Sequence, residues 1–265
     1  MTARPIGVFD SGLGGLTVLR ALIDLLPNEP VVYFGDTGRF PYGPKPGDEV
    51  LKYALQIGDV LAERDAKLLV VACNSAASVA LDALRARHDI PVIGVIDPGM
   101  RAAIAASRSG RIGVIGTVGT IASGAYQRAA DASGTDVTLT CAACPGFVEF
   151  VEAGDVDSDQ VHVLAERLLA PVRDAGVDTL VLGCTHYPML ARTIGDAMGR
   201  DVILVSSADE TAFEVRELLA AGDLAAPPES SARHAFLTSG DVETFRRLGA
   251  RFLGPEVASV QRWEW

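Results

Sequence analysis

Short apolar runs alternate with longer segments of mixed polarity along the 265 residues of this chain. The runs are rich in Val, Ile and Leu and show little alternation of apolar with polar positions. This pattern is typical of strands that are covered on both faces of a parallel sheet. The predicted strands are 6–9, 31–35, 68–72, 92–95, 112–115, 137–140, 180–183, 202–205, 234–238 and 258–261.

Segments of helical length separate most of these strands. Strands that alternate with helices indicate an α/β protein, in which helices cover a parallel sheet. The predicted helices include 17–26, 48–64, 75–88, 159–175, 189–198 and 210–221.

A faint internal repeat divides the chain into two similar parts. Apolar segments of the first part recur in the second, in the same order and at a nearly constant offset: 6–8 with 112–114, 31–35 with 137–141, and 92–95 with 202–205. Chance similarity is the alternative, because any two α/β units share apolar strands. We predict two similar open parallel-sheet α/β domains with the active site in the cleft between them. Residues 1–97 plus 207–265 form the first, with the C-terminal tail returning to it, and 98–206 form the second.

The charge balance and the cysteine content limit the function classes. The net charge is −11, with 34 acidic and 23 basic residues, and no clustered Lys/Arg run offers a face for phosphates, so we expect no nucleic-acid partner. No apolar stretch reaches membrane-spanning length, so we expect no membrane partner. Four cysteines in so long a chain do not make a disulfide scaffold. The expectation is a soluble cytoplasmic protein with reduced thiols.

Two cysteines occupy matching places at the ends of predicted strands. Cys73 follows 68–72 and Cys184 follows 180–183. Ligands bind at the carboxyl ends of strands in open α/β sheets, and helices begin in the turns beyond, so we expect the helix dipole and amide groups to lower each thiol's pKa. A buried structural cysteine is the alternative for either thiol alone. Polar residues follow each sulfur: Asn74, Ser75, Thr185 and His186.

Glycine-rich and proline-rich turns follow other predicted strands at the same sheet edge. The turn 10–15 offers backbone amides suited to an anion, but Thr17 stands where a dinucleotide-binding fingerprint requires its third glycine. Asp10 is either a helix cap or a group that handles a proton. The stiff loop 36–46 places Tyr42 and Gly43 where they can close over a small ligand, although a plain surface loop fits equally well.

A single C-x-x-C pair, Cys141 and Cys144, raises the possibility of a redox centre or half of a zinc site. The chain has no second such pair, and His162, the nearest histidine in sequence, has no ligand spacing with it. We therefore predict no metal site and no redox role. A short helix is predicted just beyond, with Glu149 and Glu152 on it.

Several of these segments together resemble the signature set of bacterial glutamate racemase, a family of the cofactor-independent aspartate/glutamate racemase group. The similarity runs from about residue 5 to about residue 210, in order and with full spacing. The segments that carry it are 7–15, 36–37, 40–43, 72–76, 116–117 and 182–188.

The resemblance implies cofactor-free interconversion of L- and D-glutamate, which supplies D-glutamate for peptidoglycan, by a homodimer. It places the two catalytic cysteines at Cys73 and Cys184 and the assisting groups at Asp10, His186 and Glu152. Ser75 stands where the family usually has Thr, and 146–152 is less typical of the family. The substrate-binding positions that it implies are Asp10, Ser11, Pro41, Tyr42, Gly43, Asn74, Ser75, Thr117, Thr185 and His186.

The expected mechanism uses two bases on opposite faces of one carbon. One cysteine thiolate removes the α-proton and the other cysteine, as a thiol, donates a proton to the opposite face. By family analogy, Cys73 deprotonates D-glutamate and Cys184 deprotonates L-glutamate. Donors near the α-carboxylate have to stabilise the carbanion.

Two other functions remain open on sequence alone, whereas a pyridoxal phosphate mechanism is disfavoured. Pyridoxal phosphate needs a Schiff-base lysine, and Lys45 lies between prolines, Lys52 on a predicted helix and Lys67 before a strand, so we expect no cofactor. A racemase for aspartate or another small acid would use the same machinery. A non-catalytic amino-acid sensor would use both thiols only to line a pocket.

Overall fold

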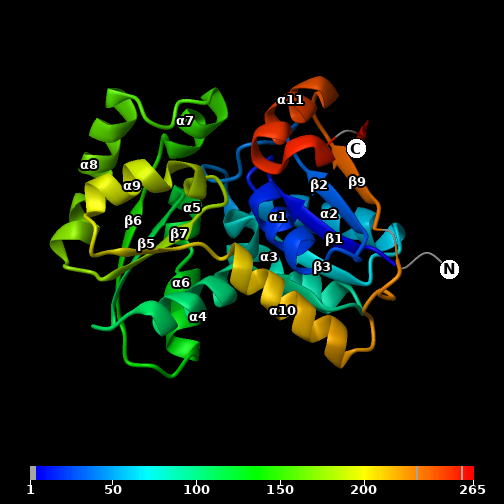
Figure 1. The fold of residues 1–265 in the computed structure, drawn as a ribbon, viewed down its shortest axis with the longest axis horizontal. Helices are drawn as coiled ribbons and strands as arrows, with labels where there is room; N and C mark the ends of the chain where they lie inside the picture. The colour runs from blue at the N-terminus through cyan, green and yellow to red at the C-terminus, as the bar shows by residue number, and fades with distance from the viewer. Residues whose placement is uncertain (1–3, 231, 258) are drawn as a thin grey trace.

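Two parallel sheets lie side by side in the computed structural model, which describes residues 4–230, 232–257 and 259–265 (Figure 1). The first sheet contains β1 (Ile6–Asp10), β2 (Val31–Gly35), β3 (Leu68–Val71), β4 (Val92–Gly94), β9 (His234–Thr238) and β10 (Val260–Arg262). The second sheet contains β5 (Arg111–Gly116), β6 (Thr138–Ala143), β7 (Thr179–Gly183) and β8 (Ile203–Val205).

The two sheets repeat one strand order. The order is β10-β9-β2-β1-β3-β4 in the first sheet and β6-β5-β7-β8 in the second, so β2-β1-β3-β4 and β6-β5-β7-β8 correspond strand for strand. All the pairings are parallel. The prediction of an α/β fold with two similar parallel sheets is confirmed. β9 pairs with β2, so this late strand extends the first sheet.

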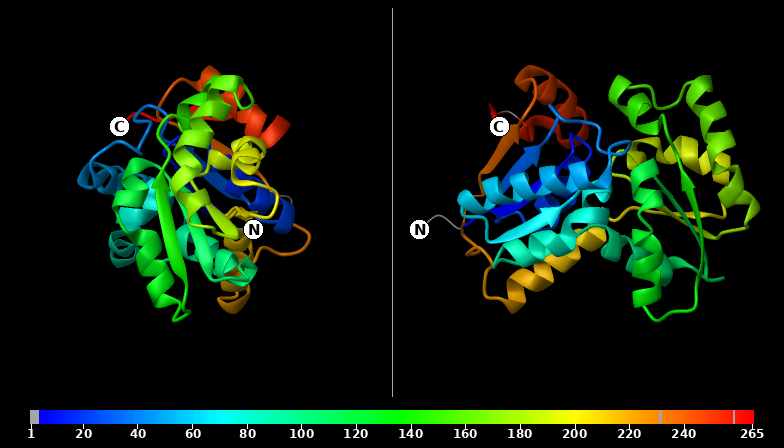
Figure 2. Two further views of the ribbon diagram at one scale, coloured as in Figure 1. Left: turned by 90° about the vertical axis from the view of Figure 1, so that its left-hand side faces the viewer. Right: turned by 180° about the vertical axis from the view of Figure 1, so that it is seen from behind.

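Helices cover both faces of each sheet because right-handed crossovers that run in opposite directions leave their helices on opposite faces. In the first half, α1 packs against α10 and α11, and α2 packs against α3. These helices are α1 (Leu16–Leu25), α2 (Gly47–Glu63), α3 (Asn74–Arg87), α10 (Ala208–Ala221) and α11 (Val242–Leu253). The blue N-terminal and the orange and red C-terminal elements share one half of the molecule (Figure 2).

In the second half, α8 packs against α9, and α4 contacts α6, β7 and β8. Since α4 also contacts α3 and α10, it joins the two halves. The helices are α4 (Ile96–Ala106), α5 (Val118–Ala122), α6 (Ala125–Ala132), α7 (Phe147–Ala153), α8 (Asp159–Asp174) and α9 (Ala191–Met198), with 3₁₀ turns η1 (Tyr187–Leu190) and η2 (Gly254–Glu256).

The sequence pattern located the strands better than the helices. It did not predict α4, because Asp97-Pro98-Gly99 reads as a turn; Pro98 lies in the first turn of α4, where a missing N–H costs nothing. The helices α5, α6 and α11 were also missed. The strand predicted at 137–140 is observed at Thr138–Ala143. The strand predicted at 258–261 is observed at Val260–Arg262, and residue 258 lies outside the described residues.

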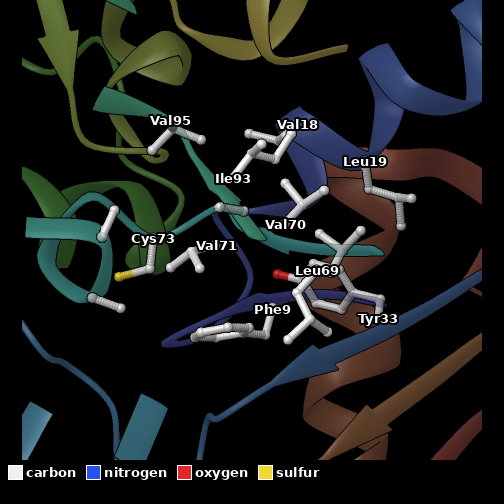
Figure 3. Close-up of a cluster of buried hydrophobic side chains, with 14 of the residues drawn as sticks. Phe9, Val18, Leu19, Tyr33, Leu69, Val70, Val71, Cys73, Ile93 and Val95 are labelled. Carbon is white, nitrogen blue, oxygen red and sulfur yellow. The ribbon is translucent and has the colours of Figure 1, made fainter. Parts of the chain in front are cut away.

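Two hydrophobic clusters form the core. The larger one fills the first half and continues into the second sheet through side chains such as Ile112, Val114 and Val181, so the halves share a core on one side. The smaller cluster covers the other face of the second sheet. Cys73 lies at the edge of the larger cluster, with its sulfur pointing away from the labelled core side chains (Figure 3). No helix within the described ranges is long and apolar enough to span a membrane.

Candidate active site

Cys73 and Cys184 lie at the carboxyl ends of β3 and β7, which occupy equivalent places in the two sheets. Cys73 is the N-cap residue of α3, and Cys184 precedes the turn η1. Both are buried, with exposed fractions of 5% and 6%. The repeated fold therefore delivers one thiol from each half.

Both thiols line one cavity between the halves, with a volume of about 620 Å³ measured out to its mouth. The predicted site residues in its wall are Ser11, Pro41, Tyr42, Gly43, Cys73, Asn74, Ser75, Thr117, Cys184, Thr185 and His186. Asp10 and Glu152 do not line it, and each contacts a residue that does.

The Cys73 thiol differs from the sequence-based expectation. Burial, together with the nearby Asp10 charge, raises its pKa to about 12, although the amides of Ala76 and Ser11 and the Ser11 hydroxyl act to lower it. The expectation that the helix start lowers this pKa is wrong, because desolvation of a buried thiolate outweighs the amide dipoles. Cys73 is therefore a thiol at neutral pH.

Asp10 is completely buried behind the cavity wall and connects the two halves. Its Oδ1 accepts from the Gly12 amide at 2.8 Å, and its Oδ2 accepts from the Thr185 hydroxyl of the second half at 3.1 Å. Burial raises the pKa of this carboxyl, against the lowering effect of His186 and of the hydrogen bonds. Since Gly15 is the N-cap residue of α1, Asp10 is not the helix cap.

A second set of groups surrounds Cys184. The Nδ1 atom of His186 lies 3.9 Å from the Cys184 sulfur, and its Nε2 lies 2.8 Å from Oε1 of Glu152 on α7. Burial alone would lower the pKa of His186, but Cys184 and Glu152 outweigh it and raise the pKa to about 10. These partners therefore favour the protonated, imidazolium form of the ring.

Hydroxyl groups from both halves meet at one wall of the cavity. The Ser75 hydroxyl lies 3.0 Å from that of Thr117 and 3.2 Å from that of Thr120, which is 1% exposed. The Gly119 amide donates to the Gly43 carbonyl at 2.9 Å beside them. Thr120 was not among the predicted site residues, because its placement follows from a helix, α5, that the sequence pattern did not predict.

The loop that carries Tyr42 is held by a buried carboxylate. The Tyr42 hydroxyl donates to Asp36, so this hydroxyl is already engaged. Asp36 also accepts from Arg39 Nε at 2.7 Å and from the Ser239 hydroxyl at 2.5 Å. These contacts fix the loop between β2 and α2 against the first half.

Cys141 and Cys144 do not form a pair. Both thiols are free; Cys141 packs against the larger hydrophobic cluster and Cys144 belongs to the smaller one. Cys144 does line the cavity, which its place in a C-x-x-C did not indicate. In the described ranges, no group of three or more His, Cys, Asp or Glu side chains is arranged to hold a metal ion.

Comparisons with known proteins agree with this geometry. The model of the Asp/Glu/Hydantoin racemase family matches residues 7–213. A glutamate racemase from Mycobacterium leprae is 55% identical over 97% of this chain and 94% of its own length.

Two solved structures have the same fold. A glutamate racemase from Bacillus anthracis superposes with a TM-score of 0.95 at 42% identity, over 100% of this chain and 98% of the other. A glutamate racemase from Francisella tularensis, solved in complex with D-glutamate, gives 0.93 at 32% identity, over the same shares of the two chains.

Paired α/β halves around one cavity, together with these relatives, define an isomerase of the amino-acid racemase class. Within that class, the chain belongs to the glutamate racemase family.

Proposed function

We propose that this protein racemises glutamate by a two-thiol proton transfer across the cavity. The thiolate of one cysteine removes the α-proton, and the thiol of the other donates a proton to the opposite face of the same carbon. The observation that carries the proposal is that Cys73 and Cys184, at equivalent strand ends of two similar halves, line the same cavity. Inversion of a stereocentre requires the two sulfurs on opposite faces of one carbon, and two halves that each contribute one thiol to the same cavity can supply that arrangement.

The raised pKa of Cys73 suits the weak acidity of an amino-acid α-carbon. A thiolate that is hard to form is a strong base once formed. At a pKa of about 12 it is rarely present at neutral pH, so a neighbouring group has to take the thiol proton. Asp10, whose own pKa is raised by burial, is the candidate beside Cys73.

His186 is the group that exchanges a proton with Cys184. Its ring, held by Glu152, takes the Cys184 thiol proton to give an imidazolium beside a thiolate, and it returns that proton to the sulfur when Cys184 has to act as the donor. We assign Cys73 to deprotonation of D-glutamate and Cys184 to deprotonation of L-glutamate.

The cavity wall also supplies groups for the carbanion. Donors in this wall come from Ser11, Asn74, Ser75, Thr117 and Thr185. Hydrogen bonds to the α-carboxylate strengthen as charge moves onto it, and apolar neighbours such as Phe40 and Val148 exclude water. Glutamate is the proposed substrate because the Francisella relative was solved with D-glutamate.

Replacement of each cysteine tests the mechanism. We expect Cys73→Ala and Cys184→Ala to lose at least about 100-fold in kcat, the lower end of the usual contribution of an acid or base. Circular dichroism of L- and D-glutamate measures racemisation, and incubation with L-aspartate tests the substrate. Wild type in deuterium oxide should introduce deuterium at the α-carbon. Racemisation by Cys73→Ala at the wild-type rate would refute the scheme.

We propose in addition that the chain acts in the cytoplasm as a homodimer and supplies D-glutamate for peptidoglycan, as the family resemblance implies. Sedimentation of the purified protein tests the dimer. Growth of a depleted strain that recovers only with D-glutamate tests the supply role.

A further inference from the structure

Of the two polar atoms in the Asn74 side-chain amide, the oxygen accepts a hydrogen bond and the nitrogen has no acceptor among the described residues. It follows Cys73 at the start of α3, is 3% exposed and lines the cavity. Its Oδ1 accepts a hydrogen bond from the Tyr126 hydroxyl at 2.8 Å. Within the described part of the chain, nothing accepts a hydrogen bond from its Nδ2.

A buried donor without an acceptor is unusual in a folded protein, because it has lost water without gaining a partner. The carboxamide oxygen and nitrogen lie on opposite sides of the group, so binding of Oδ1 by Tyr126 turns Nδ2 away from that tyrosine. Because Asn74 forms part of the cavity wall, a molecule in the cavity is positioned to satisfy this donor.

The surroundings of Tyr126 hold its hydroxyl in one position as a hydrogen-bond donor. It lies on α6 of the second half, is 1% exposed, and packs against Gly183, the residue before Cys184. A Cβ on Gly183 would lie 3.2 Å from the Tyr126 hydroxyl. Burial, with the nearby Cys184 as a second cause, raises the pKa of this phenol, which keeps the hydroxyl protonated.

We propose that Tyr126 is a positioning residue for the racemase reaction: its hydroxyl fixes the Asn74 carboxamide so that the NH₂ group donates to a carboxylate oxygen of the bound amino acid. Without the hydroxyl, the carboxamide can rotate and present its oxygen to that carboxylate, which is repulsive. This inference rests on one part of the proposed function, namely that the cavity binds an amino acid. The hydrogen bond between Tyr126 and Asn74 joins α6 of one half to α3 of the other. Substrate binding is therefore linked to how closely the two halves lie together.

Tyr126→Phe removes the hydroxyl and keeps the ring. We expect kcat/KM for both enantiomers to fall about five-fold, the size expected for one neutral hydrogen bond. Tyr187→Phe is the matched control, since Tyr187 is also fully buried and its hydroxyl donates to the Cys144 carbonyl at 3.1 Å. This control should stay within about two-fold of wild type, and urea unfolding of both variants reports any general loss of stability.

A double-mutant cycle separates positioning from a merely structural role. If Tyr126 acts through Asn74, Tyr126→Phe costs nothing further once Asn74→Ala has removed the amide. Equal losses in the wild-type and the Asn74→Ala backgrounds would overturn the proposal. So would a Tyr126→Phe protein with wild-type kcat/KM.

Binding without turnover distinguishes this inference from the proposed mechanism. Titration calorimetry of D-glutamate into Cys73→Ala and into Cys73→Ala with Tyr126→Phe should give a dissociation constant about five-fold higher for the double variant. If Cys73→Ala still racemises glutamate while Tyr126→Phe weakens binding, the two-thiol mechanism fails and the role of Tyr126 stands. Equal dissociation constants would refute the role of Tyr126.

Discussion

The two thiols of the cavity differ in the charge beside them. Cys73 has a buried carboxyl as its neighbour, and both it and Asp10 have raised pKa values. Cys184 has an imidazolium as its neighbour, because Cys184 and Glu152 outweigh the burial of His186. The repeated fold therefore supplies equivalent positions for the sulfurs but opposite charges for their partners. Substitutions on the two sides should change the separate kcat and KM values of the two directions differently, while kcat/KM changes equally in both because the two enantiomers have equal free energy.

The pH dependence of stability tests the His186 assignment. Its folded-state pKa of about 10 lies above the ordinary 6.5, so its stabilisation is full below pH 6.5 and is lost as the pH rises through 10. Glu152→Gln lowers that folded-state pKa. Urea unfolding should show that the variant is destabilised more at pH 6 than at pH 9.5.

Glu166→Gln is the matched control for this measurement. Glu166 pairs with Arg173 on the surface of α8, where its side chain is 55% exposed. Its small effect should be nearly the same at both pH values, because the pair is exposed to solvent. A Glu152→Gln protein with a pH-independent loss would contradict a charged His186.

At the scale of the elements, continuous apolar runs identify strands, but they do not show which helices pack against those strands. Continuous apolar runs located β2 and β9 to the residue, since both lie in a sheet covered on each face. Short helices such as α5 and α6 carry no apolar period long enough to recognise. The strand-end residues of the site were therefore predictable, while Thr120 and Tyr126, which lie on those helices, depend on tertiary packing.

The loop between β2 and α2 depends on Arg39 for its position. The Arg39 guanidinium lies between the rings of Tyr53 and Trp265, at 4.0 Å and 3.7 Å from their centroids, while its Nε donates to the buried Asp36. Arg39→Met leaves that carboxylate without its counter-charge and should cost about 3 kcal/mol in unfolding free energy. The KM for glutamate should rise, because Pro41 and neighbouring residues of this loop line the cavity.

The exposed ion pair between Arg246 and Glu243 gives the control for Arg39. Arg246→Met should change the unfolding free energy by less than about 1 kcal/mol and leave the KM unchanged. Urea unfolding and initial rates measure both variants. A destabilised Arg39→Met protein with wild-type KM would mean that the loop keeps its place without this arginine.

For the whole molecule, the cavity exists only while the halves stay close. Polar contacts cross between them around it, from Asp10 to Thr185, from Ser75 to Thr117 and between the backbones of Gly43 and Gly119. On another side, the larger hydrophobic cluster and α4 join the halves permanently. Such a layout allows the cavity edge to part without unfolding of the protein.

A substitution at Gly14 tests most directly whether catalysis needs the two halves to close at the cavity edge. A Cβ there would collide with the Thr185 hydroxyl and lie 2.5 Å from Nδ1 of His186, both in the other half. Those side chains are held by Asp10 and Glu152, so they cannot simply turn away. Gly14→Ala should therefore hold the halves apart and lower kcat/KM by about 100-fold, the cost of misplacing reacting groups by an ångström.

Gly195→Ala, within α9, is the control because its new Cβ would meet Leu204 at an ordinary 3.8 Å. This change should raise the unfolding free energy by about 0.5 to 1 kcal/mol and leave activity unchanged. Since Gly14→Ala disturbs the boundary between the halves together with the site residues Thr185 and His186, its activity loss should far exceed the loss that its own unfolding curve predicts. Wild-type kcat/KM in Gly14→Ala would mean that closure at this boundary is not needed for catalysis.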